Sequence, residues 1–186
     1  MVAIGQLWLP IVLSALIVFV VSSIIHMMLP WHKGDYATVP GEDKVMDALR
    51  PFNIPPGDYM VPRPSSMADL KTDAFKQKME RGPKLVMTVM PNGSPGMGSN
   101  LLQWFLYGIV VAVFAGYITG HALGAGADYL QVFRFVGATA FLGYGLALWQ
   151  YSIWYRRSWI ITIKANIDAL IYACLMAGTF GWLWPK

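Results

Sequence analysis

Charged residues are scarce in this chain of 186 residues. They make up 13% of the sequence, whereas an ordinary soluble domain carries about 25%. This deficit, together with long apolar runs, excludes an ordinary soluble domain and favours lipid as the main solvent. The length excludes a large transporter with internal repeats, but it leaves room for several membrane spans and one modest extramembrane unit.

Cysteine and histidine are also scarce. The single cysteine, Cys174, excludes an intrachain disulfide and a cysteine-based metal site. The three histidines, His26, His32 and His121, form no metal-binding motif. His26 and His121 are expected at opposite membrane edges and cannot share one haem, although His26 alone could be an axial ligand. We therefore expect no metal and no cofactor.

The net charge of +4 does not indicate nucleic-acid binding. No cluster of lysine and arginine is interleaved with aromatic residues on a soluble face, and the basic residues lie where membrane topology places them. The partners that we expect are membrane lipids and other integral membrane subunits, and no nucleic acid.

Four apolar runs, at residues 4–28, 101–120, 129–155 and 159–184, are each long enough to cross a bilayer. We expect an all-α membrane protein, a bundle of four transmembrane helices with a small mixed α/β cytoplasmic insert between helices 1 and 2. Residues 1–29 form helix 1, residues 30–100 the insert, and residues 101–186 helices 2–4. One full span plus an interfacial helix remains an alternative for the last two runs.

The first run is interpreted as a membrane span and not as a cleaved signal peptide. It lacks a basic segment at its start, its apolar region is too long, and no small-residue cleavage site precedes Pro30. Residues 11–28 contain no charged residue and as a helix would extend about 27 Å, close to the thickness of a bilayer core.

The basic residues predict the orientation. Nine of the lysines and arginines lie in the insert, and Arg156 and Arg157 lie on the same side if there are four spans. Only Arg134 and Lys186 lie toward the other side. Because cytoplasmic segments carry the lysine and arginine excess, we expect a bacterial inner membrane protein with a cytoplasmic insert and both termini outside.

The insert has signals of regular structure. Residues 41–49 predict a short helix that stops before Pro51, and residues 66–69 resemble a capping box that opens a second helix extending to Arg81. The β-branched residues of 84–90 indicate a strand. We expect it to pair in parallel with residues 59–61, because a helix lies between them.

Small residues recur every four positions in three of the runs, which is typical of close helix packing in membranes. We expect helix packing at Gly116, Gly120 and Gly124, at Gly143 and Ala147, and at Ala165, Ala169, Ala173, Ala177 and Gly181. The pattern does not say whether the partner helix belongs to the same chain.

Three ionisable residues are expected at membrane depth: Arg134, Lys164 and Asp168. Such residues are functional candidates by default. Lys164 and Asp168 are four residues apart on one helical face, so we expect them to pair. Alternatively, Asp168 and Asn166 form a polar spot for a partner or an ion. We expect Arg134 to pair with Asp128 or to reach lipid headgroups.

Catalytic motifs are not apparent. Residues 91–98 resemble a phosphate-binding loop but lack its lysine and Ser/Thr order, so we interpret them as a connector and expect no enzyme. A membrane enzyme remains an alternative; it would need a cleft that gathers Asp58, Tyr59 and residues 92–94.

Several short sequence segments carry a resemblance to known proteins. Among them are Leu29-Pro-Trp-His-Lys-Gly-Asp35, Phe141-Leu-Gly-Tyr-Gly-Leu-Ala-Leu-Trp-Gln150 and Thr179-Phe-Gly-Trp-Leu-Trp-Pro185. Together they resemble a group of uncharacterised small bacterial integral membrane proteins, over nearly the whole chain. The resemblance implies a bacterial inner membrane; it implies no activity and no functional residue.

Two functions follow as hypotheses. The first is a non-catalytic accessory or structural subunit of a larger bacterial membrane complex of respiratory, photosynthetic or transport type. It would dock through the small-residue helix faces and the cytoplasmic insert. The second is a small membrane transporter or lipid-handling protein that uses Asp168 or Arg134. This second hypothesis requires a hydrated cavity that reaches one of these two residues.

Overall fold

The computed structural model describes residues 1–93 and 96–186 and divides the chain into two compact units. The first unit combines Met1–Ala37 with Gly96–Lys186 and contains the apolar runs. The second, Thr38–Pro95, is the insert.

The helical unit contains four helical segments that are long and apolar enough to cross a membrane: Ile4–Met28, Met97–Ala122, Tyr129–Tyr155 and Trp159–Trp182. This confirms the four predicted runs as helices. The first segment comprises a 3₁₀ turn, η1 (Ile4–Leu7), then α1 (Trp8–Ser23) and a π-helical turn, η2 (Ile24–Met28). The second is α4 (Met97–Ala122) and the fourth is α7 (Trp159–Trp182).

The third segment is interrupted. It consists of α5 (Tyr129–Tyr144), a 3₁₀ turn, η6 (Leu146–Leu148), and α6 (Trp149–Tyr155). The interruption is at Gly145, where a Cβ atom would lie 3.0 Å from both the Ala169 Cβ and the Asn166 Oδ1 atoms of α7. The glycine therefore permits a close approach of α7, and the helix changes direction after it.

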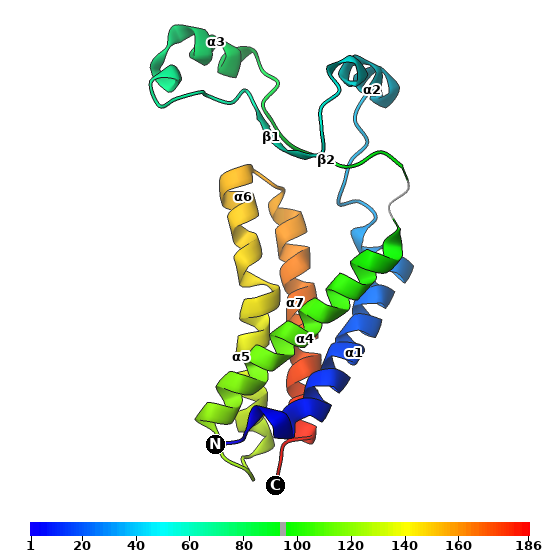
Figure 1. The fold of residues 1–186 in the computed structure, drawn as a ribbon, viewed down its shortest axis with the longest axis vertical. Helices are drawn as coiled ribbons and strands as arrows, with labels where there is room; N and C mark the ends of the chain where they lie inside the picture. Colours follow the sequence, from blue (N-terminus) through cyan, green and yellow to red (C-terminus); the bar gives the residue numbers. More distant parts are fainter. Residues whose placement is uncertain (94–95) are drawn as a thin grey trace. The chain divides into compact units, whose positions relative to one another are not determined.

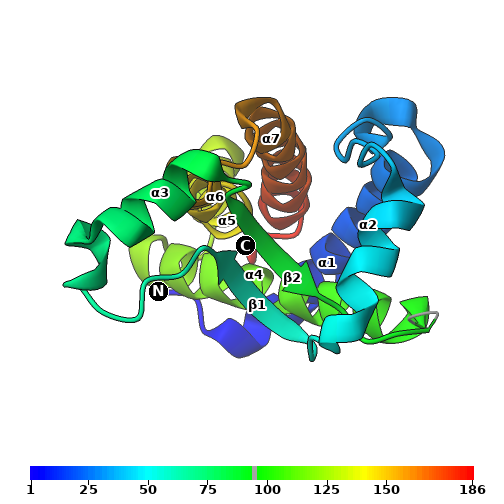
Figure 2. The same cartoon turned by 90° about the horizontal axis from the view of Figure 1, so that it is seen from above.

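The four segments pack in a ring. α1 contacts α4 and α7, and α5 contacts the same two helices, so each segment has two neighbours (Figures 1 and 2). Figure 1 shows that α4 crosses the others obliquely. The fully buried side chains inside the ring include Leu7, Val18, Val132, Val136, Met176 and Phe180.

Small residues produce tight packing at the end of the bundle where both termini lie (Figure 1). A Cβ atom on Gly120 would lie 2.6 Å from the Val2 carbonyl oxygen, and one on Gly181 would lie 2.7 Å from the ring of Tyr129. Ala169, Ala173 and Ala177 are buried. These predicted packing positions are therefore occupied by contacts within the chain.

Other predicted packing positions have different surroundings. A Cβ atom on Gly124 would meet nothing within 4 Å, because α4 ends at Ala122 and the four-residue repeat continues past the helix. A side chain at this position therefore has no packing neighbour among the described residues, and a contact of Gly124 with another chain stays a prediction. Ala147 and Ala165 line a cavity described below.

The outward faces of the helices carry large apolar side chains. Exposed positions include Val12, Leu16 and Val20 in α1, Val110 and Phe114 in α4, and Ile163, Ile167 and Leu170 in α7. Exposed apolar surface of this extent is unusual for a soluble protein and is expected of helices surrounded by lipid.

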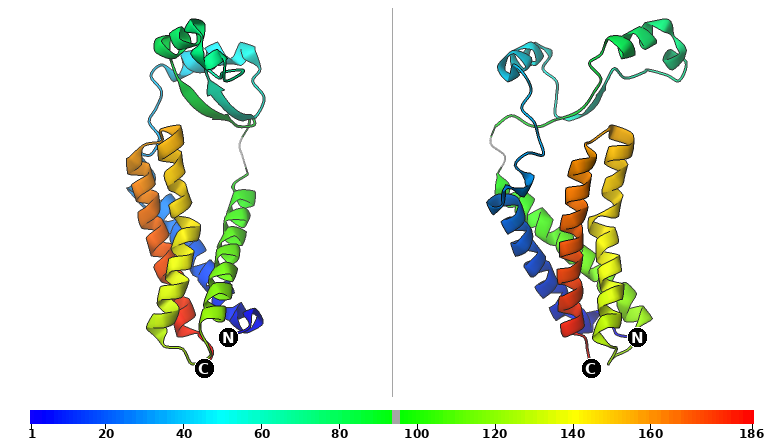
Figure 3. Two further views of the ribbon diagram at one scale, coloured as in Figure 1. Left: turned by 90° about the vertical axis from the view of Figure 1, so that its left-hand side faces the viewer. Right: turned by 180° about the vertical axis from the view of Figure 1, so that it is seen from behind.

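The insert contains two helices and two strands, α2 (Glu42–Leu49), β1 (Gly57–Val61), α3 (Asp73–Arg81) and β2 (Leu85–Val89), joined by short 3₁₀ turns. The strands pair antiparallel, with Gly57 opposite Val89 and Val61 opposite Leu85. The predicted parallel pairing is wrong. A parallel crossover must return along the sheet, whereas α3 lies beyond one end of the strands (Figure 3).

The predicted capping box forms but opens a different element. The Ser66 backbone amide donates to the Asp69 carboxylate, and the Asp69 amide donates to the Ser66 hydroxyl. These bonds lie at the start of a 3₁₀ turn, Asp69–Lys71. The α-helix begins only at Asp73, where the Thr72 hydroxyl accepts from the Phe75 amide as the N-cap.

Two glycine substitutions test the packing of the terminal end. Gly120→Ala should lower the free energy of unfolding by about 1–3 kcal/mol, because its methyl group would overlap the backbone at Val2. Gly124→Ala is the control and should change it by less than about 0.5 kcal/mol. Unfolding in mixed detergent micelles measures both, and equal effects would contradict the packing.

Candidate functional site

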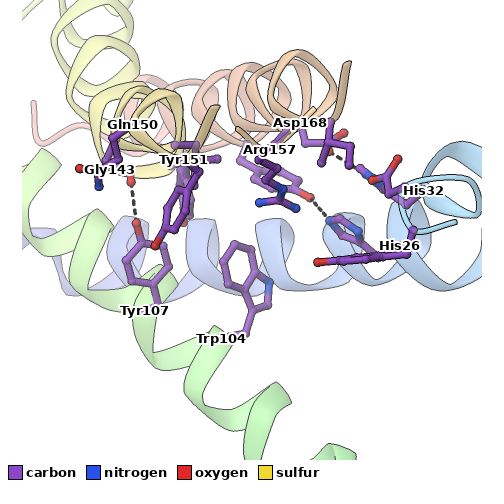
Figure 4. A pocket seen from close by; sticks show the side chains of 17 residues that line it. His26, His32, Trp104, Tyr107, Gly143, Gln150, Tyr151, Arg157 and Asp168 are labelled. Carbon is purple, nitrogen blue, oxygen red and sulfur yellow. Dashed lines mark hydrogen bonds and ion pairs between the residues drawn. The ribbon is translucent and has the colours of Figure 1, made fainter. Parts of the chain in front are cut away.

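A cavity of about 590 Å³ lies between the four helical segments, at the end of the bundle where α1 ends and α4 begins. We call it the interhelical pocket. Figure 4 shows the side chains that line it. They come from the chain after α1, from α4, from the end of α5, from the segment between α5 and α7, and from α7 itself. The lining residues include His26, His32, Asp35, Trp104, Tyr107, Tyr144, Ala147, Tyr151, Arg157, Ala165, Asp168 and Tyr172.

Asp168 is the buried charge of this pocket, with only 3% of its surface exposed. Its Oδ1 atom accepts a hydrogen bond from the Trp31 indole at 3.2 Å, and its Oδ2 atom lies 2.8 Å from His32 Nε2. Trp31 and His32 belong to a 3₁₀ turn, η3 (Pro30–His32), which follows η2 after Leu29. These partners supply the hydrogen bonds that a buried carboxylate needs.

His32 lies between two carboxylates. Its Nδ1 atom is 2.6 Å from Asp35 Oδ2, and its Nε2 atom faces Asp168. Asp35 also accepts from the Lys164 ammonium at 2.8 Å. The bonds from Lys164 and then from His32 lower the pKa of the Asp35 carboxyl below its usual value, against the effect of burial, which raises this pKa.

The predicted Lys164–Asp168 pair does not form. Lys164 donates instead to Asp35 and to the Trp31 carbonyl oxygen, both at 2.8 Å, and its ammonium lies 5.4 Å from the centre of the Trp31 ring. The two residues share a helical face, but both have nearer partners in the segment that follows α1. The prediction used only the spacing of Lys164 and Asp168 along one helix, so it did not consider partners from that segment.

His26 lies in the π-helical turn at the end of α1. Its ring stacks on that of His32, with 4.2 Å between centroids, and its Nε2 atom is 3.3 Å from the Tyr172 hydroxyl. One donor atom each of His26, His32 and Asp168 lie within 4.8 Å of one another. Sequence spacing does not indicate this group, because His32 and Asp168 are 136 positions apart.

Aromatic side chains form another wall of the pocket. Trp104 lies 5.6 Å from Tyr107, 6.0 Å from Tyr144 and 6.1 Å from Tyr172, measured between ring centroids. The Trp104 indole donates to the Ser22 hydroxyl of α1 at 2.8 Å, which fixes the ring between α1 and the pocket. The Tyr144 hydroxyl is buried and has no hydrogen-bond partner in the part of the chain that is described.

Arg157 supplies a positive charge to the same pocket. It follows α6, where Arg156 adopts a left-handed backbone conformation and the Arg157 amide donates to the Tyr151 carbonyl oxygen. The side chain is half-buried and forms no ion pair with any described residue. In Figure 4 it lies between Tyr151 and His26.

The remaining predicted polar residue lies elsewhere. Arg134 is exposed on α5 and forms no ion pair within the described residues, so the expected pair with Asp128 is not found. Asp128 instead caps α5 by accepting from the Leu130 amide. The pocket therefore reaches Asp168 and not Arg134.

The residues proposed for an enzyme in the insert have other roles where they are described. The Asp58 carboxylate accepts from the Thr88 hydroxyl across the strand pair, and the Tyr59 hydroxyl donates to the Pro55 carbonyl oxygen. Ser94 lies outside the described residues. The sequence interpretation missed the roles of Trp31, Asp35, Trp104 and Tyr172. A Trp-His-x-x-Asp group directly after a span could have indicated Trp31 and Asp35, whereas Trp104 and Tyr172 have no comparable local signal.

Comparison of the chain with protein-family models, curated proteins and solved structures finds no match. The interpretation of the site therefore depends on its own geometry.

The Asp35 contacts predict a pH dependence of stability. Because the folded-state pKa of Asp35 is lowered, its stabilising effect is full above the unfolded pKa of about 3.9 and is lost as the pH falls through the folded value. Asp35→Asn should therefore reduce stability by about 1–3 kcal/mol at pH 6. The difference in unfolding free energy between the wild type and Asp35→Asn should become smaller below about pH 4.

Asp73→Asn is the control. It removes an ion pair with Lys76 whose partners are 58% and 89% exposed, and such pairs contribute little. Unfolding in detergent micelles at several pH values measures both variants. A wild-type advantage over Asp35→Asn that does not change between pH 6 and pH 3 would contradict the role given to the Asp35 carboxylate.

Proposed function

We propose that this chain is a multi-pass protein of a bacterial inner membrane that binds a small amphipathic molecule with an acidic head group in the interhelical pocket. The observation that carries the proposal is the cavity of about 590 Å³ that reaches Asp168. Its volume falls in the range of about 300–1,000 Å³ that is typical of small-molecule sites. A cavity of this kind was the requirement of the transporter or lipid-handling hypothesis.

The charges of the pocket indicate the head group. Both acidic residues already have positive or hydrogen-bonding partners, Asp35 with Lys164 and His32, and Asp168 with His32 and Trp31. Among the charged residues that line the pocket, Arg157 is the one that forms no ion pair with any described residue. A guanidinium group binds carboxylates and phosphates through paired hydrogen bonds, so the proposed ligand carries one of these groups.

The walls of the pocket indicate the rest of the ligand. Trp104, Tyr107 and Tyr151 present aromatic rings, and Ala147 and Ala165 leave room beside them. Rings and small apolar side chains favour an apolar body over a second charged group. A fatty acid or an acidic lipid of similar size combines both features.

The membrane orientation is part of the proposal. The four long helices and their apolar outward faces support insertion. The lysine and arginine excess supports a cytoplasmic insert and termini outside. The pocket would then lie at the cytoplasmic end of the bundle, because that end carries the connections to the insert.

A role as an accessory subunit of a larger membrane complex is a second proposal, supported by the insert. No described residue between 38 and 93 is buried, and Phe52, Met67 and Met90 are more than 70% exposed. A unit that has no buried core and exposes large apolar side chains is typical of a surface that binds a partner protein. Purification of a stable single chain from native membranes, with no co-purifying protein, would contradict this role.

A variant that fills the pocket tests the main proposal. Ala147→Trp places a large side chain in the cavity at a position that is itself exposed, so the bundle should still fold. Labelling of the protein in lipid vesicles by a photoactivatable fatty acid should fall several-fold. Arg157→Gln should weaken binding of this probe about tenfold, which corresponds to about 1.4 kcal/mol.

Ala138→Trp is the matched control, because Ala138 is exposed on α5 and does not line the pocket. It should label like the wild type. Mass spectrometry of the labelled peptides should place the probe on α4 and α7 beside the cavity. Equal labelling of Ala147→Trp and the wild type would contradict a ligand in the pocket.

A further inference from the structure

Three side chains with metal-binding atoms meet at one end of the interhelical pocket. His26 comes from the π-helical turn after α1, His32 from the 3₁₀ turn that follows, and Asp168 from α7. One donor atom from each lies within 4.8 Å of the other two. In a tetrahedral zinc site with bonds of about 2.0–2.1 Å, the ligand atoms are about 3.3 Å apart.

The contact between His32 and Asp168 requires a shared positive centre. If His32 donates its Nδ1 proton to Asp35, its Nε2 atom presents a lone pair to Asp168 Oδ2 at 2.8 Å. Two acceptor atoms at this distance require a positive centre between them. A proton fits between the two atoms at this distance. A metal ion would displace the proton and would move the two atoms apart, to the separation of about 3.3 Å between zinc ligands.

Outer contacts orient two of the three ligands. Asp35 holds the ring of His32 through Nδ1, the arrangement by which a carboxylate commonly supports a metal-bound histidine. The Trp31 indole holds Asp168 through Oδ1 and leaves Oδ2 for the ion. The Lys164 ammonium in turn bonds to Asp35 and to the Trp31 carbonyl oxygen.

His26 needs one adjustment. Its ring is stacked on His32 at an interplanar angle of 19°, and a nitrogen lone pair lies in the plane of its ring. Two parallel stacked rings cannot direct their lone pairs at one ion, so the ring of His26 must turn out of the stack. Its side chain borders the cavity, which provides the room for this rotation.

We propose that His26, His32 and Asp168 bind one divalent first-row transition metal ion, with a coordination position open to the interhelical pocket. Two imidazoles and one carboxylate suit zinc, iron, cobalt or nickel, whereas magnesium and calcium prefer sites made of oxygen atoms alone. The open position would take water or a ligand atom. This inference does not depend on the amphipathic ligand proposed above.

Zinc titration of the full chain tests the inference. The protein carries an affinity tag without histidine, is purified in detergent, and is freed of metal with a chelator. It is then incubated with excess zinc and desalted, and the zinc that remains bound is counted by elemental mass spectrometry. One zinc ion per chain is expected. Cobalt in place of zinc should give visible absorption bands that the chelator removes. Both His26→Gln and His32→Gln should weaken zinc binding by about 100-fold or more.

His121→Gln is the control. Its imidazole is exposed, bonds to the Tyr117 carbonyl oxygen through Nδ1 and does not line the pocket, so zinc binding should not change. His26→Gln is the decisive variant, because it removes a ligand but breaks no ion pair to Asp35 or Asp168. Its thermal unfolding midpoint verifies that it folds.

Two results would overturn the inference. One is wild-type protein that retains no zinc after desalting, and the other is a folded His26→Gln that binds zinc as tightly as the wild type. Both are measured without any lipid probe, so failure here is distinct from failure of the fatty-acid labelling experiment.

Discussion

The buried carboxylate of Asp168 sets the structure of one end of the helical unit. A charge with 3% exposure is stable only where hydrogen-bond donors or opposite charges replace the lost water. α7 supplies no such partner to it, since Lys164 bonds elsewhere. The partners come from Trp31 and His32, so the chain must turn back against α7 soon after α1 ends.

The pocket follows from this constraint and from the uneven packing of the bundle. At the terminal end, Gly120, Gly181 and Ala177 allow backbones and rings to approach closely. At the other end, α5 and α7 approach closely only at Gly145. Long side chains of α4 make contacts there with α1 and α5, such as Trp104 to Ser22 and Tyr107 to the Gly143 carbonyl oxygen. Tight packing at one end and spacing by aromatic rings at the other leave a cavity that polar groups border.

Composition and periodicity were sufficient to predict the four long helices, α2, and both strands, because each is determined by residues close in sequence. The pairing of Asp168 was not predictable in this way, since its partners lie more than 130 residues away. The spacing of Gly124 fits the four-residue repeat, but α4 ends at Ala122, and no described residue packs there. The strand pair was misjudged because the direction of pairing depends on the position of α3 in space.

The most direct test of the account is a double-mutant cycle on His32 and Asp168. The free energy of unfolding is measured in mixed detergent micelles for the wild type, His32→Gln, Asp168→Asn and the double variant. The contact predicts a coupling energy of about 1–3 kcal/mol, with the double variant less destabilised than the sum of the single variants. Additivity within about 0.5 kcal/mol would show that the two side chains do not interact and would contradict the construction of the pocket described above.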